Sequence, residues 1–124
     1  MRLLLDTHVF LWWNEDDPRL KQEVKDTIVG AEGNVVSAAS AWEVAIKSAL
    51  GKLKLQVPFE EAVEINAFQK LTVDFRHASA TAALPPYHAD PFDRLLIAQA
   101  LTEGLTLVTH DRVFARYGIP VIWT

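Results

Sequence analysis

The sequence contains no cysteine, and this absence removes several kinds of chemistry at once. Without thiols the chain can form no disulfide, no thiolate zinc site and no thiol nucleophile. It also lacks a phosphate-binding G-x-x-x-x-G-K-[ST] loop, a G-x-G-x-x-G fingerprint after a strand and a G-x-S-x-G nucleophile elbow. Its four histidines show neither H-x₃-H spacing nor an HExxH motif. The side chains left as candidates for a metal site are mainly carboxylates.

Long hydrophobic runs are absent as well. The apolar stretch at the N-terminus is interrupted by Asp6 and His8, so neither a signal-peptide core nor a membrane span can form there. We therefore expect a cytoplasmic protein with no membrane partner. At 124 residues, half of them hydrophobic and without repeats, residues 1–124 should form a single domain. The net charge of −4 argues against a general nucleic-acid coat but leaves an RNA substrate open.

Short apolar runs alternate with longer segments of helical periodicity. The runs lie at residues 3–5, 35–36, 71–73, 105–108 and 121–123 and are typical of strands buried on both faces. Helices are expected at residues 18–29, 38–50, 59–68 and 77–84, and from Asp90 to just before Gly104. This alternation predicts an α/β fold whose central parallel sheet is covered on both faces.

The helix expected at residues 38–50 carries apolar residues at helical spacing. Trp42, Ile46 and Leu50 should pack inward along one stripe, with Glu43 at its edge and turned toward the sheet. Ser40 and Glu43 also have the S-x-x-E spacing of a capping box.

Four acids stand where the chain passes from strand or loop into helix: Asp6, Glu43, Asp93 and Asp111. In a right-handed parallel sheet these junctions share one edge, so distant carboxylates can meet there. Oxygen ligands without soft donors suit Mg²⁺ or Mn²⁺, which support water-mediated phosphoryl chemistry. Thr109 ends the fourth strand and offers a hydroxyl to such a site.

Each acid also has an ordinary structural explanation. Asp6, Asp90 and Asp111 are preferred N-cap residues, and Asp93 suits the first turn of a helix because the helix dipole favours negative charge there. Because Pro91 makes Asp90 the natural N-cap, we rank Asp93 above Asp90 as a metal ligand and keep Asp90 as a candidate for the outer coordination shell. The functional interpretation depends on the acids converging, which capping does not require.

Histidines, lysines and arginines have mainly structural or surface interpretations. His88 and His110 are the exceptions to consider, since they lie near the acids in the sequence. Candidates for phosphate contact are Lys47, Lys52, Lys54, Arg94, Arg112 and Arg116.

The four acids at the strand-to-helix junctions lie within longer motifs that resemble those of a known family. The stretches Leu5-Asp6-Thr7, Ser37 to Leu50, Asp93 to Ala100 and Leu107 to Asp111 are similar to the successive motifs of PIN-domain ribonucleases, in particular VapC-type toxins of toxin–antitoxin pairs. The resemblance implies a three-layer α/β/α sandwich and Mg²⁺- or Mn²⁺-dependent endonucleolytic cleavage of RNA. It also implies homodimerisation and inhibition by a cognate antitoxin. Carried over by motif, Asp6, Glu43, Asp93 and Asp111 bind the metal, and Thr109 assists them.

Two other functions remain open from the sequence. A Mg²⁺-dependent phospho-receiver domain normally has paired acids after its first strand and a lysine after its last. This chain has Asp6-Thr7 and no lysine beyond Lys70. The second alternative is a PIN-like dimeric binding module without catalytic activity, which retention of all four acids disfavours.

Overall fold

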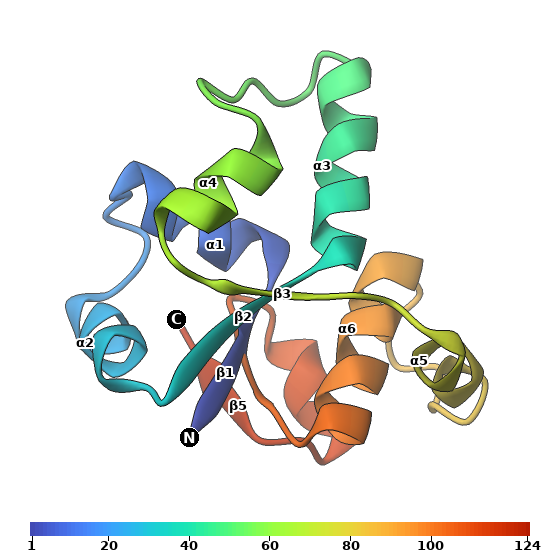
Figure 1. The fold of residues 1–124 in the computed structure, drawn as a ribbon. Coiled ribbons are helices and arrows are strands. Elements are labelled where there is room, and N and C mark those ends of the chain that lie inside the picture. Colours follow the sequence, from blue (N-terminus) through green and yellow to red (C-terminus); the bar gives the residue numbers. More distant parts are fainter.

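The chain folds around a five-stranded sheet in which every pair of neighbouring strands is parallel (Figure 1). The structure is a computed structural model that describes residues 1–124. The strands are β1 (Arg2–Leu5), β2 (Gly33–Ser37), β3 (Gln69–Leu71), β4 (Thr106–Thr109) and β5 (Val121–Trp123). They lie in the order β3-β2-β1-β4-β5. The predicted central parallel sheet is confirmed.

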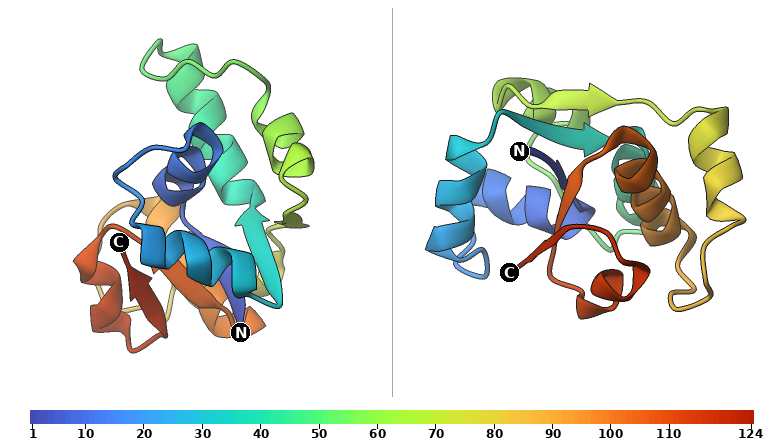
Figure 2. Two further views of the ribbon diagram at one scale, coloured as in Figure 1. Left: turned by 90° about the vertical axis from the view of Figure 1, so that its left-hand side faces the viewer. Right: turned by 90° about the horizontal axis from the view of Figure 1, so that it is seen from below.

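Helices cover both faces of this sheet (Figure 2). They are α1 (Thr7–Glu15), α2 (Gln22–Gly30), α3 (Ala38–Ala49), α4 (Phe59–Ile65), α5 (Phe75–Thr81) and α6 (Pro91–Glu103), with a 3₁₀ helix, η1 (Arg112–Tyr117), before β5. Residues of α1, α2 and α4 form one hydrophobic core with the sheet, and residues of α6 and η1 form the other. The architecture is therefore the expected three-layer sandwich.

The alternation of side chains along β1 explains why its apolar run is continuous. Leu3 and Leu5 are buried in the core beside α1, whereas Leu4 is buried in the core beside α6. Successive residues of a strand face opposite sides, so a strand covered on both faces must be apolar at every position. Each fully buried leucine stabilises the fold by about 1.5–3 kcal/mol relative to an exposed one.

Several predicted boundaries differ from those observed. The helix expected at residues 18–29 begins at Gln22, so Pro18 lies outside it. The third strand is Gln69–Leu71 rather than residues 71–73, because Asp74 already caps α5 through the backbone N–H groups of Arg76 and His77. The helices expected at residues 59–68 and 77–84 are α4 and α5, which end at Ile65 and Thr81.

The face of α3 that packs inward is not the predicted one. Trp42 is 63% exposed, and Ile46 and Leu50 are also exposed. Glu43 is buried instead, on the same side of the helix as Val44. The N-cap is Ser37, whose hydroxyl accepts from the Ala39 amide, so the capping box expected from Ser40 and Glu43 does not form.

The reason is visible in the arrangement of the elements. The helix α3 starts at the end of β2 and extends beyond the edge of the sheet, so most of its length packs on α1, α4 and α6 rather than on strands (Figure 1). The side of α3 that carries Trp42, Ile46 and Leu50 therefore does not face the centre of the molecule.

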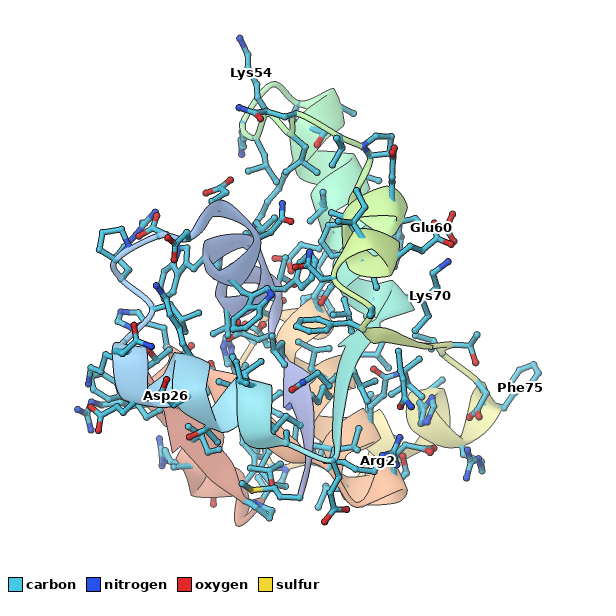
Figure 3. The ribbon with its side chains drawn as sticks, turned by 60° about the vertical axis from the view of Figure 1, so that its left-hand side comes forward. Arg2, Asp26, Lys54, Glu60, Lys70 and Phe75 are labelled. Carbon is cyan, nitrogen blue, oxygen red and sulfur yellow. The ribbon has the colours of Figure 1, made fainter.

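Lys54, Lys70 and Phe75 lie on the surface of the molecule. Lys70 on β3 pairs with Glu60 of α4 at 2.8 Å, and Phe75 points into solvent (Figure 3). Lys54 projects outward from the loop between α3 and α4 (Figure 3). No helix of the structure combines the length and the apolar character needed to cross a membrane.

The strand order determines where a site can form. The chain moves from β1 to β2 on one side, and later enters β4 on the other side of β1. In a parallel sheet a crevice opens at such a reversal, beyond the carboxyl ends of the two central strands. Asp6 follows β1 and Thr109 ends β4, so both lie at this position.

Candidate active site

Asp6 is held at the carboxyl end of β1 by hydrogen bonds to both of its oxygens. Its Oδ1 accepts from the Val9 amide at 2.9 Å, which confirms the N-cap prediction, and its Oδ2 accepts from Thr109 Oγ1 at 2.6 Å. The residue is only 7% exposed. Burial raises the pKa of Asp6 above its usual range, and the hydrogen bonds from Thr109 and Val9 oppose this increase.

Thr109 connects Asp6 to Asp111. Its hydroxyl donates to Asp6 and accepts from the Asp111 amide at 3.0 Å. Asp111 Oδ1 in turn accepts from the Val113 amide, which caps η1 as predicted. Capping uses only Oδ1 of Asp6 and Oδ1 of Asp111. Each aspartate can therefore cap a helix and also belong to the site.

Asp93 stands in the first turn of α6, three residues after the predicted cap, Asp90. Asp90 Oδ1 accepts from the amides of Phe92 and Asp93 at 2.8 and 3.1 Å, so Asp90 is the N-cap and the Asp93 carboxylate is left for other partners. Burial raises the pKa of Asp93 to about 7, and four negative charges contribute further. These charges belong, in decreasing order, to Asp90, Asp6, Glu43 and Asp111.

Glu43 reaches the site from α3 and is 7% exposed. Its Oε1 accepts from Thr7 Oγ1 at 2.7 Å and its Oε2 accepts from Lys47 Nζ at 3.0 Å. Lys47 therefore balances the charge of Glu43. The Glu43 charge acts on both Asp6 and Asp93.

His88 is the site residue that the sequence indicated only by its nearness to the acids. Its Nε2 lies 2.9 Å from Asp93 Oδ2 and 3.1 Å from Asp111 Oδ2. One atom of each of these three residues lies within 4.8 Å of the others, so the imidazole and the two carboxylates meet at one place in the site. The Asp90 amide donates to His88 Nδ1 at 3.3 Å, which leaves the Nε2 hydrogen to face the two carboxylates.

Arg94 fixes the loop that carries His88. Its guanidinium donates to the backbone carbonyls of Thr81, Leu84, Pro85 and His88 at 2.9–3.3 Å. Because these bonds occupy both terminal nitrogens, Arg94 orders the approach to α6 and is not free for the phosphate contact that the sequence suggested. His110, the other histidine near the acids, pairs through Nδ1 with the Thr124 carbonyl.

Three of the four predicted acids face a common cavity of about 520 Å³, whereas the buried Glu43 does not line it. It is lined by Asp6, Asp93 and Asp111 together with His8, Trp12, Arg19, His110, Arg112 and Phe114. Carboxylates this close raise one another's pKa unless a cation is bound between them, and oxygen donors of this kind suit a hard divalent ion. The donor set therefore fits Mg²⁺ or Mn²⁺.

Comparison with known proteins gives a consistent result. The family model described as "PIN domain" matches residues 3–120. Ribonuclease VapC22 of Mycobacterium tuberculosis is 34% identical over 113 residues, which cover 89% of this chain and 87% of that protein.

Solved structures share the fold at lower sequence identity. The DNA-bound VapBC of Salmonella typhimurium superposes with a TM-score of 0.71 at 18% identity, covering 98% of this chain and 97% of that one. VapBC2 of Rickettsia felis, bound to a DNA fragment of its promoter, gives 0.70 at 15% identity, with 98% of each chain covered. These likenesses establish a shared fold.

Proposed function

The chain belongs to the PIN domain family, and from this premise we propose that it is a divalent-metal-dependent endoribonuclease that serves as the toxin of a toxin–antitoxin pair. The observation that carries the proposal is the convergence of Asp6, Asp93 and Asp111 on one cavity. The raised pKa of Asp93, which burial and the surrounding acids cause together, supports it. Its relative VapC22 is named a ribonuclease, and its structural relatives were solved as VapBC assemblies.

Asp6, Asp93, Asp111 and Glu43 are the proposed ligands, with Mg²⁺ or Mn²⁺ as the cation. A bound divalent ion supplies Lewis acidity, makes water an effective nucleophile near neutral pH and offsets charge on a phosphodiester. Asp90 belongs to the surroundings of the site, because its own oxygen is engaged in capping α6.

The chain's other residues contribute position and charge. Thr109 holds Asp6 and Asp111 in one arrangement, and Thr7 and Lys47 orient Glu43. Such preorganisation reduces the reorganisation needed when substrate binds. No carboxylate needs to act as a nucleophile, since the acids bind and orient the reacting groups.

A cognate antitoxin and a second copy of the chain are the proposed protein partners. The structural relatives described as VapBC support the antitoxin. The exposed Trp42, Ile46 and Leu50 of α3 provide an apolar surface for a protein contact.

The function is tested by incubating the purified chain with end-labelled single-stranded RNA and Mg²⁺ or Mn²⁺. We expect internal cleavage that stops in excess chelator and returns when the cation is restored. Cleavage that continues in chelator would contradict the metal dependence. RNA binding without cleavage under every condition would favour the non-catalytic binding module.

Thr109→Val tests how the site is held together. Valine keeps the shape of this fully buried side chain but removes the donor to Asp6 and the acceptor for the Asp111 amide. We expect Mn²⁺ affinity to fall by about 10-fold or more, as for other groups that orient metal ligands. The free energy of unfolding should fall by about 1–3 kcal/mol because buried polar groups lose their partners.

Titration calorimetry with Mn²⁺ and urea denaturation measure these two effects. Thr106→Val, at the start of the same strand, is the matched control because the Thr106 side chain makes no hydrogen bond. Equal Mn²⁺ affinity in the two variants would show that Thr109 does not organise the site.

A further inference from the structure

The cavity at the acids is divided by charge. Asp6, Asp93 and Asp111 form its acidic part, whereas two arginines and two histidines, Arg19, Arg112, His8 and His110, contribute the rest of its polar lining. A divalent cation would balance the acidic part, but it would not hold the phosphates on either side of the one being cleaved. Positively charged side chains are needed to bind these flanking phosphates of an RNA strand.

The two arginines of the cavity differ in how their charge is used. Arg19 binds Asp17 through Nε at 3.1 Å and through a terminal nitrogen at 2.7 Å, so a neighbouring carboxylate already balances it. The Arg112 side chain forms no ion pair and no hydrogen bond within the chain, and it is exposed at the cavity. Its N–H donors are therefore available to an anion.

Trp123 holds the Arg112 side chain in place. The guanidinium carbon lies 3.8 Å from the centroid of the indole ring, and Lys21 Nζ lies 4.1 Å from the same ring. The indole is itself fixed, because its Nε1 donates to the His110 carbonyl at 2.9 Å and its ring stacks with the His110 imidazole. A stacked guanidinium loses less conformational freedom when it binds a phosphate than a free side chain does.

Building on the proposed function, we infer that Arg112, supported by Trp123, binds an RNA phosphate adjacent to the scissile one. Arg112 follows Asp111 directly in the chain, so the anchored phosphate lies beside the acidic part of the cavity. Lys21 adds a second positive charge at the same indole. The substrate class is single-stranded RNA, because an unpaired strand can bend its backbone so that one phosphate reaches Arg112 while the next lies at the acids.

The chain provides a matched control for this inference. Arg116 lies on η1 with Arg112, and its guanidinium carbon is 4.2 Å from the centroid of the Tyr87 ring. Arg116 also makes no ion pair, yet it does not line the cavity. Replacing either arginine by alanine removes one stacked positive charge from the same helix, so the two variants differ mainly in position.

The experiment measures binding of a fluorescein-labelled oligouridylate by anisotropy in Mg²⁺, using the Asp93→Asn chain so that the RNA stays intact. Adding Arg112→Ala should weaken binding by about five- to tenfold, and should reduce the slope of log affinity against log salt by about 0.7. Adding Arg116→Ala should change neither quantity appreciably. Arg112→Lys, which keeps the charge, should recover most of the salt slope.

Cleavage assays with otherwise wild-type chains separate this inference from the proposed function. Arg112→Ala should raise KM by about five- to tenfold, with a smaller change in kcat. If the chain cleaves RNA but Arg112→Ala and Arg116→Ala behave alike, the inference is wrong and the function stands. If no RNA is cleaved but binding still depends on Arg112, the proposed function is wrong and the phosphate contact stands. Failure of the Asp93→Asn chain to bind the oligouridylate overturns the inference.

Discussion

Asp93→Asn is expected to reduce RNA cleavage by about 100-fold or more while making the metal-free protein more stable above neutral pH. The loss of cleavage follows from removing a charged ligand from the site. The gain in stability follows from removing a carboxylate that is crowded by four other acids. A residue kept only for folding would not show these opposite effects.

The direction of the stability effect follows from the pKa values. The pKa of Asp93 is about 7 in the folded chain, against an ordinary value of 3.8. Between these pH values the folded chain binds more protons than the unfolded chain, so the free energy of unfolding falls as the pH rises. The stabilising contribution of Asp93 to folding is therefore complete below about pH 4 and is lost as the pH rises through 7. At pH 8 we expect asparagine to raise the free energy of unfolding by about 1–2 kcal/mol, after allowing for solvent screening of this partly exposed side chain.

Asp90→Asn is the matched control for this variant. It removes a charge of the same sign three residues earlier, and asparagine keeps the capping oxygen that accepts from the Phe92 and Asp93 amides. Cleavage should stay within a few-fold of wild type. Urea denaturation in chelator at pH 5 and pH 8, together with cleavage rates, provides the comparison. Full cleavage by Asp93→Asn, or equal loss in both variants, would contradict the assignment.

The affinity for Mn²⁺ is expected to rise by about 100-fold between pH 5 and pH 7. A cation bound at Asp93 must displace its proton, so below the pKa of about 7 each pH unit changes the apparent affinity about tenfold. Above pH 7 the dependence should level off. Asp6, whose pKa burial also raises, adds to the slope in the acidic range.

Titration calorimetry in two buffers of different ionisation enthalpy measures both the affinity and the protons released. Wild type should release close to one proton from Asp93 at pH 6, and the Asp93→Asn variant should lose that release together with the corresponding part of the pH dependence. An unchanged proton release in the variant would mean that Asp93 is not at the cation site.

Local patterns in the sequence account for the elements and for the caps. The continuous apolar runs predicted buried strands, and the N-cap preference of aspartate correctly placed Asp6, Asp90 and Asp111 at the starts of helices. These interactions span only a few residues, so the sequence contains them directly. The packing face of α3 could not be read in this way, because Trp42 and Glu43 are adjacent and only the surrounding helices decide which one is buried.

The sequence by itself determined that this protein is an alternating α/β chain with acids at its strand-to-helix junctions. Only the tertiary structure decided that Asp6 and Asp111 lie at the same crevice, because this depends on β1 and β4 being neighbours in the sheet. It also decided that His88 meets Asp93 and that Arg112 rests on Trp123. The physical reason is that contacts between distant segments are set by strand order and packing, and local periodicity does not record either of these.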